Sequence, residues 1–353
     1  MNLADISTPA VIVDLNVARR NVEAFQSYMT EHGFRARPHI KTHKLPRLAE
    51  MQLTAGAAGI TCQKVSEAEA MAAGSASIRD ILITYNILGA EKLARLKDLA
   101  GKVTLAVVAD NARTIDGLSQ AFATAPRPLR VLVECNTGAD RCGVTSPAAA
   151  LDLARRIDGA AGLTFGGLMT YPPTGGGAQV QAFMTEAKGL IEAAGLEVGT
   201  ITSGGTPDMW RAHEAPVVTE YRAGTYIYND RSLVARGVCG WQDCALAVYA
   251  TVVSVPAKNR AIVDAGSKTL TSDLLGLKGH GHVIGRDDIA IDQLSEEHGR
   301  LVAEGPIDLA VGDKLRIVPN HACVVTNMVD TVYVTSGDGD YQAWPVVARG
   351  KIY

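Results

Sequence analysis

Lysine and histidine are concentrated in one seven-residue stretch, P-H-I-K-T-H-K at residues 38–44. A lysine amine can bond covalently to a carbonyl group, and histidine exchanges protons near neutral pH. The stretch follows an apparent strand, which makes Lys41 the first candidate for covalent chemistry, whereas Lys44 is expected to be an ordinary residue at a helix start. His39 and His43 could each serve an active site or be hydrogen-bonded structural residues.

A second stretch, S-G-G-T-P at residues 203–207, has the composition of an anion-binding turn. The adjacent glycines Gly204 and Gly205 let backbone N–H groups approach an anion, and the hydroxyls of Ser203 and Thr206 add donors. The stretch contains no Arg or Lys, so backbone donors rather than a cationic cluster would hold the anion. The alternative interpretation is a flexible turn.

A third stretch, P-N-H-A-C at residues 319–323, places a histidine two residues before a cysteine. Residues two apart on a strand point to the same face, so His321 and Cys323 could bind one metal ion together. The pair alone is a weak signal, because two ligands rarely hold a metal without help, and a buried strand pair is the alternative. Thiolate with imidazole favours zinc among the common ions.

Short β-prone runs alternate with helix-prone segments through the first two thirds of the chain. The runs lie at about 36–40, 57–61, 80–84, 103–109, 129–135, 163–169, 198–203 and 217–227, and segments such as 65–73 and 91–100 are rich in Ala, Leu and Glu. Continuous apolar runs are typical of parallel strands buried on both faces. Eight such units predict a closed (β/α)₈ barrel, with a doubly wound open sheet as the alternative architecture.

Beyond residue 235 the pattern changes to alternating stretches, such as A-L-A-V-Y-A-T-V-V-S-V and D-K-L-R-I-V-P, separated by Gly, Pro and Asp. This pattern indicates antiparallel β structure with little helix. We therefore predict two domains, a barrel at residues 1–235 and a C-terminal β domain at residues 236–353 that carries the metal pair.

Composition excludes several classes of partner. The net charge is −3, and the chain has no long apolar run and no basic and apolar leader, so we expect neither nucleic-acid binding nor membrane association. The six cysteines form no C-x-x-C pair and no small-domain disulfide framework, which fits the reducing cytoplasm.

Polar residues follow the predicted strands at the end where barrels place their chemistry. They are Lys41, Gln63, Tyr85, Asn86, Asp110, Asn111, Arg141, Tyr171, the segment 203–206, Tyr226 and Tyr228. S-G-G-T-P follows the seventh strand, where barrels commonly hold phosphate, and this position favours the anion site over the flexible turn. A phosphate site opposite a strand-end lysine suggests pyridoxal phosphate, which needs one amine and one phosphate pocket.

The chain resembles the fold-type III, alanine-racemase-like pyridoxal-phosphate enzymes, and specifically the D-threonine aldolase and D-serine dehydratase branch. The motifs that carry the resemblance run in the expected order along nearly the whole chain: T-P-A-V-I-V-D-L (8–15), R-P-H-I-K-T-H-K (37–44), G-I-T-C-Q-K-V-S-E-A (59–68), N-T-G-A-D-R-C-G-V (136–144), S-G-G-T-P (203–207), R-A-G-T-Y-I-Y-N-D (222–230), V-D-A-G-S-K (263–268) and P-N-H-A-C (319–323).

The resemblance implies a role for each matching residue. It makes Lys41 the lysine that bonds to the cofactor, and it places Arg141 near the cofactor's phenolic oxygen and the substrate carboxylate. Tyr171 would lie beside the cofactor ring. Residues implied to contact the cofactor are thus Lys41, Gln63, Arg141, Tyr171, Ser203, Gly204, Gly205, Thr206 and Tyr226, with Lys41, Arg141, Tyr171 and His43 as the catalytic candidates.

The resemblance leaves two reactions open on D-β-hydroxy amino acids. An aldolase would break the Cα–Cβ bond to give glycine and an aldehyde, and a dehydratase would give a 2-oxo acid and ammonia. Q-K-V-S-E-A, R-C-G-V and Tyr171 are similar to the aldolases, which typically have H-x-D at the metal site, whereas H-x-C at 321–323 is similar to the dehydratases. We predict the aldolase, with dehydration as the alternative; a racemase would not need the metal, and a barrel-only carrier protein would lack the second domain.

The resemblance also implies a divalent metal, zinc or manganese with magnesium as a further option, bound to His321 and Cys323. Relatives are dimers in which the second domain completes the partner's site. We therefore expect a homodimer, with the segment 263–273 as the candidate contribution to the partner.

Overall fold

The computed structural model describes residues 1–337 and 339–353, which form two compact units. The first, here the barrel unit, contains Ala24–Lys41, Pro46–Gly224 and Lys351–Tyr353. The second, here the β unit, contains Met1–Glu23, Thr42–Leu45 and Thr225–Gly350. The domain boundary near residue 235 stays a prediction.

The barrel unit is built on eight parallel strands. They are β2 (Arg35–Ala36), β3 (Ile60–Cys62), β4 (Asp80–Ile83), β5 (Thr104–Ala109), β6 (Leu129–Cys135), β7 (Leu163–Thr170), β8 (Ile201–Gly204) and β9 (Glu220–Arg222). β3 to β9 pair in chain order, and β2 pairs with β9. A parallel bridge between His39 and Thr61 joins the continuation of β2 to β3. The ring is thereby closed, which confirms the predicted (β/α)₈ barrel.

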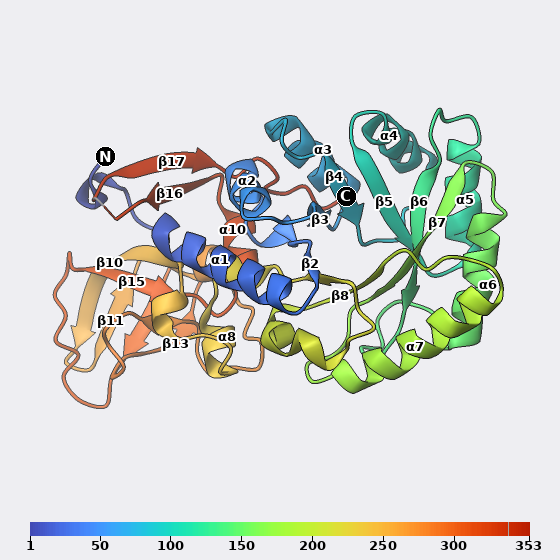
Figure 1. Ribbon diagram of the computed structural model, residues 1–353. Coiled ribbons are helices and arrows are strands. Elements are labelled where there is room, and N and C mark those ends of the chain that lie inside the picture. Colours follow the sequence, from blue (N-terminus) through green and yellow to red (C-terminus); the bar gives the residue numbers. More distant parts are fainter. Residues whose placement is uncertain (338) are drawn as a thin grey trace. The chain divides into compact units, whose positions relative to one another are not determined.

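Helices alternate with these strands along the chain: α1 (Leu15–Glu31), α2 (Pro46–Thr54), α3 (Val65–Gly74), α4 (Ala90–Ala100), α5 (Ala112–Phe122), α6 (Pro147–Asp158), α7 (Gly177–Ala193) and the 3₁₀ helix η3 (Thr206–Glu214). α4 to α7 lie outside the strands β5 to β7 (Figure 1). α5 and α6 begin at polar caps, because Asn111 and Ser146 accept hydrogen bonds from N–H groups in the first turn. The strands are buried by this cover, as their continuous apolar sequences predicted.

The barrel interior has an apolar middle and a charged N-terminal end. Leu82, Ala106, Val108, Leu132 and Met169 form the apolar cluster. At the starts of β4 and β9, Arg37 makes ion pairs with Asp80 at 2.6 Å and Glu220 at 2.8 Å. Arg37, although part of the 37–44 motif, is therefore a structural residue at the end of the barrel away from the strand ends that carry chemistry.

The β unit contains β1 (Ala10–Asp14), β10 (Leu246–Ala257), β11 (Arg260–Val263), β12 (His282–Val283), β13 (Ala290–Leu294), β14 (Gly299–Val302), β15 (Lys314–Val318), β16 (Thr331–Thr335) and β17 (Tyr341–Pro345). Its helices are α8 (Arg231–Ala235), α9 (Ser267–Leu270) and α10 (Ala322–Met328), with the short 3₁₀ turns η1 (Leu3–Asp5), η4 (Thr225–Ile227) and η5 (Trp241–Asp243). The pairs are antiparallel except β1 with β16, which confirms a mainly antiparallel β domain. The N-terminal strand β1 lies between β10 and β16, a pairing that the sequence did not predict.

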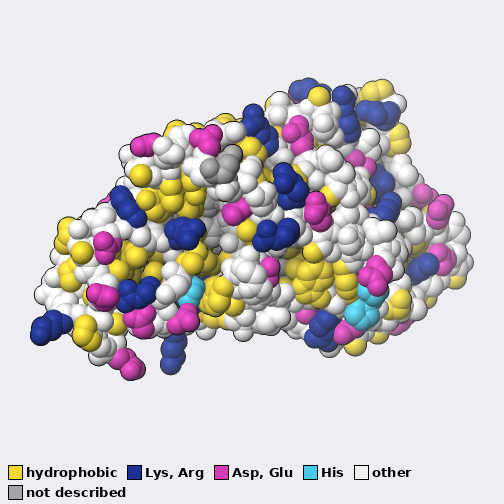
Figure 2. Space-filling view, turned by 60° about the vertical axis from the view of Figure 1, so that its left-hand side comes forward, with side chains coloured by type: hydrophobic (Ala, Val, Ile, Leu, Met, Phe, Trp, Pro, Cys, Tyr) yellow, Lys and Arg dark blue, Asp and Glu magenta, His cyan; other side chains and the backbone are white. Residues whose placement is uncertain are grey.

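Charges of both signs are interspersed on the face shown in Figure 2, where Lys and Arg side chains alternate with Asp and Glu. Such mixing agrees with the small net charge of −3. Among the described residues, none of the helices combines the length and the apolar character that crossing a membrane requires.

Candidate active site

Lys41 lies in the 3₁₀ turn η2 (Ile40–Thr42), just after the C-terminal end of β2. A chain of hydrogen bonds supports this turn. His39 Nδ1 accepts the Lys41 backbone N–H at 3.4 Å, while His39 Nε2 lies 3.1 Å from Gln63 Oε1. Gln63 Nε2 in turn donates to the Thr84 carbonyl at 2.9 Å. His39 and Gln63 therefore link the ends of β2, β3 and β4 beside Lys41, which favours a positioning role for both.

Arg141 and Tyr171, two predicted catalytic residues, contact each other. The Arg141 guanidinium carbon lies 4.7 Å from the centroid of the Tyr171 ring, and Tyr171 is 41% exposed. A cation over an aromatic face at an exposed site is worth about 0.5–1 kcal/mol. The contact orients both side chains at the C-terminal ends of β6 and β7, where barrel enzymes bind their substrates.

The loop that carries Arg141 is held by an Asn136 side chain and by one tight glycine. Asn136 Oδ1 accepts the N–H groups of Gly138 and Asp140 at 3.0 and 3.1 Å. Gly143 has φ +106°, and a Cβ there would lie 2.5 Å from the Asn136 backbone nitrogen. Only glycine fits this position without a backbone shift, so the D-R-C-G motif is explained by the turn that presents Arg141.

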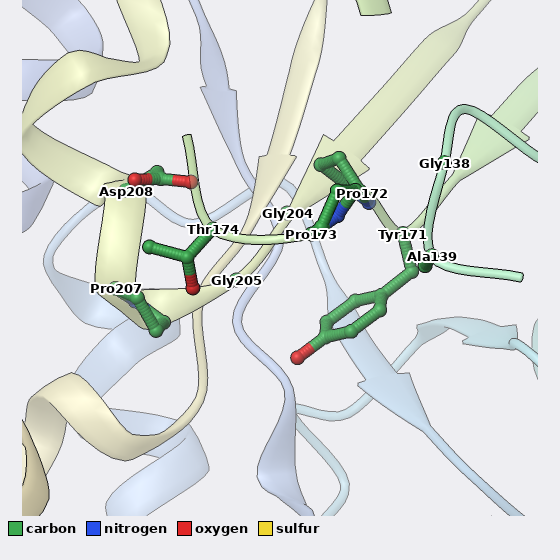
Figure 3. A pocket seen from close by; sticks show the side chains of 10 residues that line it. All are labelled: Gly138, Ala139, Tyr171, Pro172, Pro173, Thr174, Gly204, Gly205, Pro207 and Asp208. Carbon is green, nitrogen blue, oxygen red and sulfur yellow. The ribbon is translucent and has the colours of Figure 1, made fainter. Parts of the chain in front are cut away.

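A cavity of about 280 Å³ opens between the strand ends of β7 and β8. Its lining includes Gly204, Gly205 and Pro207 of the S-G-G-T-P segment and the Tyr171 ring (Figure 3). A Cβ built on Gly205 would project toward that ring, reaching 3.8 Å from it, so a side chain here would begin to fill the space. The cavity is large enough for a phosphate group, and its glycines leave room for the predicted cofactor, while the Asp208 carboxylate is also in the lining. The lining residues are Gly138, Ala139, Tyr171, Pro172, Pro173, Thr174, Gly204, Gly205, Pro207 and Asp208.

The two glycines of this segment are constrained by the neighbouring strand. The Gly205 N–H donates to the Arg222 carbonyl at 3.0 Å, and a Cβ on Gly204 would lie 2.2 Å from the same oxygen. Thr206 Oγ1 accepts the Gly224 N–H at 3.2 Å. The Gly205 N–H is therefore used in strand pairing, contrary to the expectation that it would serve as an anion donor. Ser203 is almost fully buried in β8.

Two charged residues inside the barrel mouth, Glu134 and Arg222, were missed by the sequence analysis. Arg222 is buried and donates to Thr202 Oγ1 and the Thr170 carbonyl, both at 2.7 Å, while burial lowers its pKa to about 10. Glu134 is 4% exposed, and burial, followed by the nearby Asp110 charge, raises its pKa to about 7. The sequence did contain a signal for Glu134, because it lies two residues after Leu132 in the apolar run L-R-V-L-V-E-C. Residues two apart on a strand share a face, so both side chains point into the barrel.

Asp110, Glu134 and Cys142 offer ligand atoms within 4.8 Å of one another. This spacing would suit a cation, but the positive charges of Arg141 and Arg222 already interact with the Glu134 carboxylate. They lower its pKa, whereas burial raises it. Positive charge on both arginines disfavours a further cation. The cluster is better explained as a charge-balanced group that positions Arg141.

His43 and Lys44, in the β unit, have structural partners. The His43 side chain is fully buried, its Nδ1 accepts the Leu45 N–H at 3.1 Å, and its ring lies 6.5 Å from the Tyr228 ring. Lys44 Nζ donates to Asn327 Oδ1 at 2.7 Å. These contacts favour the structural alternative for His43 and agree with the expectation that Lys44 is not the chemical lysine.

His321 and Cys323 are close together, but not on a strand. His321 is the N-cap of α10, with extended φ −139° and ψ 101°, and Cys323 lies in the first turn of that helix. The strand expectation was therefore wrong, because the segment turns into a helix directly after Asn320. The extended cap allows the two side chains to hydrogen-bond to each other.

The surroundings of Cys323 favour its thiolate. The hydroxyls of Thr42 and Thr225 lie 3.0 and 3.4 Å from its sulfur, and Thr42 directly follows Lys41 in the chain. Burial opposes ionisation of Cys323, but the hydrogen bond and charge of His321 and these hydroxyls lower its pKa. For His321, burial favours the neutral ring, but Cys323 and Asp273 raise its pKa to about 9.

An unsatisfied polar group lies near the predicted metal pair. The buried Tyr228 hydroxyl has no hydrogen-bond partner among the described residues. Burial and then the Cys323 charge raise the pKa of Tyr228, so this hydroxyl stays a neutral donor near the sulfur. Thiolate, imidazole and an unsatisfied polar group suit a catalytic metal site, in which water and substrate complete the coordination. Tyr226 is buried in η4 of the β unit, and its phosphate contact stays a prediction.

Comparison with known proteins adds the family. Residues 13–232 match the family described as alanine racemase, N-terminal domain, and residues 245–335 match the putative serine dehydratase domain. A D-threonine aldolase from Arthrobacter sp. is 34% identical over 99% of this chain and 94% of its own length. The chain belongs to the D-threonine aldolase branch of the alanine-racemase-like family.

Solved structures of the same branch agree with this placement. D-threonine aldolase from Filomicrobium marinum has a TM-score of 0.93 at 33% identity, covering 100% of this chain and 98% of that one. A cysteine-to-alanine variant of D-threo-3-hydroxyaspartate dehydratase, in the metal-free form, has a TM-score of 0.89 at 29% identity and covers 98% of both chains. The branch therefore contains both reactions that the sequence left open.

Proposed function

We propose that this protein is a pyridoxal-phosphate- and divalent-metal-dependent lyase that cleaves D-β-hydroxy amino acids to glycine and an aldehyde. The observation that carries the proposal is the near full-length similarity, at 34% identity, to a D-threonine aldolase. Membership of the alanine-racemase-like family supports pyridoxal phosphate as the cofactor. The closed barrel with a strand-end lysine and a phosphate-sized cavity agrees with it.

In this proposal each residue has a defined task. Lys41 holds the cofactor covalently, and the cavity lined by Gly204 and Gly205 receives its phosphate. Arg141, held against Tyr171, orients the substrate carboxylate. Pyridoxal phosphate supplies an acceptor for the electron pair released when the Cα–Cβ bond breaks.

The proposed metal ligands are His321 and Cys323. A divalent ion there would supply Lewis acidity toward the substrate's β-hydroxyl. The soft thiolate favours zinc, while manganese and magnesium are the other candidates. Cys323 is expected to bind as the thiolate, which its surroundings stabilise.

Dehydration is the second candidate, and Cys323 is the observation that favours it. With His321 it forms the H-x-C pattern that resembles the dehydratases, rather than the H-x-D pattern of the aldolases. A related D-threo-3-hydroxyaspartate dehydratase, solved as a metal-free cysteine variant, supports a link between a cysteine and the metal in that relative. The aldolase remains the primary proposal because Tyr171, Q-K-V-S-E-A and R-C-G-V follow the aldolase pattern.

Product analysis separates these reactions. Metal-loaded protein with bound cofactor would be incubated with D-threonine, D-serine and D-3-hydroxyaspartate. Glycine with an aldehyde supports the aldolase, a 2-oxo acid with ammonia supports the dehydratase, and accumulation of the L-enantiomer alone would contradict both.

We further propose a homodimer, acting in the cytoplasm on small D-amino acids, whose segment 263–273 reaches the partner's site while its last residue, Asp273, contacts His321 of the same protomer. The free state of all six cysteines supports a reducing compartment. The net charge of −3, with charges of both signs interspersed on the face shown in Figure 2, gives no support to a nucleic-acid or membrane partner.

A further inference from the structure

A carboxylate in the β unit contacts the ring of the proposed metal ligand. Asp273 Oδ2 lies 2.6 Å from His321 Nδ1, and both side chains are partly buried, with exposures of 38% and 24%. We propose that Asp273 is a positioning residue, which fixes the tautomer and the ring orientation of His321 so that Nε2 faces the metal. This inference rests on the proposed metal pair and adds the residue that prepares it.

The contact determines which ring nitrogen can bind a metal. A neutral imidazole carries one N–H, and its other nitrogen has the lone pair that a metal needs. When Asp273 accepts the proton of Nδ1, the lone pair is on Nε2. Carboxylate partners of this kind orient metal-binding histidines and increase their basicity.

Asp273 contacts His321 but does not complete a three-residue metal cluster with Cys323. Among the described residues, His321, Cys323 and Asp273 do not form a group whose three ligand atoms all lie within 4.8 Å of one another. His321 nevertheless contacts each of the other two. Asp273 is therefore placed to act on the imidazole rather than to share one ion with both His321 and Cys323.

The backbone around Asp273 holds an unusual conformation. Thr271, the C-cap of α9, has φ +63° and ψ 164° although it has a β-branched side chain, and it is buried. Leu275 also has a positive φ, +47°. Such strain persists only where the surrounding structure enforces it. The loop is thus fixed in the conformation that brings Asp273 to His321.

A second carboxylate fixes the backbone between the two ligands. Asp230 is fully buried, and its Oδ2 accepts the N–H of Ala322 at 3.0 Å. Ala322 lies between His321 and Cys323, so Asp230 holds the main chain while Asp273 holds the ring. The two carboxylates have separate tasks, and only the loss of Asp273 should alter the ring without moving the helix start.

The test measures metal binding directly, on full-length protein with bound cofactor. Asp273→Asn and Asp273→Ala would be titrated with Mn²⁺ and Co²⁺, and the Co²⁺ absorption spectrum recorded. We expect both variants to bind metal about 10–100-fold more weakly than the wild type, with a changed Co²⁺ spectrum. Circular dichroism and the absorbance of the bound cofactor should be unchanged, which shows that the fold is intact.

The matched control is Asp287→Asn, which removes another aspartate facing a histidine in the same unit. Asp287 Oδ1 lies 3.7 Å from His282 Nε2, and Asp287 is almost fully exposed. Its loss should leave metal affinity and the Co²⁺ spectrum unchanged. If both Asp273 variants also bind metal like the wild type with the same spectrum, the inference is wrong.

The proposed metal ligands can be tested separately from the role of Asp273. His321→Ala and Cys323→Ala should each weaken binding more than either Asp273 variant does. If His321→Ala binds Co²⁺ as tightly as the wild type, the metal lies elsewhere and the proposed function loses its metal site. If His321→Ala loses the metal while Asp273→Asn does not, only the positioning role of Asp273 is overturned.

Discussion

Lys41 and Lys44 are three residues apart, yet their surroundings differ. Lys41 follows the end of β2, whereas Lys44 Nζ donates to Asn327 at 2.7 Å in the β unit. We predict that Lys41→Ala abolishes the absorbance of the covalently bound cofactor and lowers turnover by at least about 10²-fold, because the variant cannot hold the cofactor covalently. Ultraviolet–visible spectra and product assays on purified protein would measure both effects.

Lys44→Ala is the matched control for this prediction. It removes a hydrogen bond worth about 0.5–1.5 kcal/mol and should retain the cofactor absorbance. The opposite pattern, with absorbance lost only in Lys44→Ala, would transfer the role to Lys44.

Glu134 predicts a pH-dependent stability. Burial and then the Asp110 charge raise its pKa from 4.5 to about 7. The folded protein therefore binds this proton more tightly than the unfolded chain, so the contribution of Glu134 to stability is greatest below pH 4.5 and falls as the pH rises toward about 7. The difference corresponds to about 3 kcal/mol, at about 1.4 kcal/mol for each pKa unit.

Glu134→Gln should remove this dependence. We predict that the variant and the wild type have similar free energies of unfolding at about pH 4 and that the variant is more stable by about 3 kcal/mol at about pH 8. Urea unfolding of the cofactor-free proteins at both pH values would measure the difference. Glu186→Gln, an exposed change on α7, should stay within about 0.5 kcal/mol of the wild type throughout. Parallel pH profiles for Glu134→Gln and the wild type would show that the pKa is not raised.

The pairing of β8 with β9 explains the glycines of S-G-G-T-P better than the anion does. A Cβ on Gly204 would lie 2.2 Å from the Arg222 carbonyl oxygen, so the strands would have to separate. We predict that Gly204→Ala lowers the free energy of unfolding by about 1–3 kcal/mol, as overpacking typically does. Thermal unfolding of the cofactor-free protein would measure it, because a loss of phosphate contacts alone would not appear there.

Gly189→Ala is the matched control for Gly204→Ala, because it makes the same substitution where no neighbouring atom is in the way. Gly189 lies exposed within α7, and a Cβ there meets nothing within 4 Å. The variant should be more stable by about 0.5–1 kcal/mol, because alanine favours helix over glycine. An unchanged melting temperature for Gly204→Ala would mean that the β8–β9 contact can relax.

Sequence patterns predicted the elements whose signals are local. Each barrel strand overlaps one of the eight predicted runs, and α3 and α4 match the predicted helical segments to within one residue. His321 was placed on a strand because its spacing to Cys323 fits a period of two, but a helix begins at Ala322 and the extended cap gives the same proximity. The pairing of β1 was missed because its partners, β10 and β16, lie more than 230 residues away in the sequence. A local hydrophobic pattern does not indicate which distant strands will pair.

At the scale of the whole molecule, the sequence predicted the parts of the site that carry motifs. Lys41, Arg141 and Tyr171 lie at strand ends as expected, because the barrel topology fixes that edge. Glu134, Arg222 and Asp273 were missed because their roles depend on burial and on neighbours distant in sequence.

The residues proposed to bind the cofactor and those proposed to bind the metal lie on different units. Loss of the metal should therefore be possible without loss of the cofactor. Lys41 and the cavity at Gly205 belong to the barrel unit, whereas His321 and Cys323 belong to the β unit. We predict that chelation removes activity toward D-β-hydroxy amino acids by at least about 10²-fold and leaves the absorbance of the bound cofactor intact. Added Mn²⁺ or Zn²⁺ should restore turnover and raise the free energy of unfolding by about 2.7 kcal/mol at a concentration 100 times the Kd. His321→Ala should reproduce the properties of the chelated protein, and added metal should not restore its activity.

Two outcomes would contradict this separation of metal and cofactor binding. One is full activity of the metal-free protein, and the other is loss of the cofactor absorbance together with the metal.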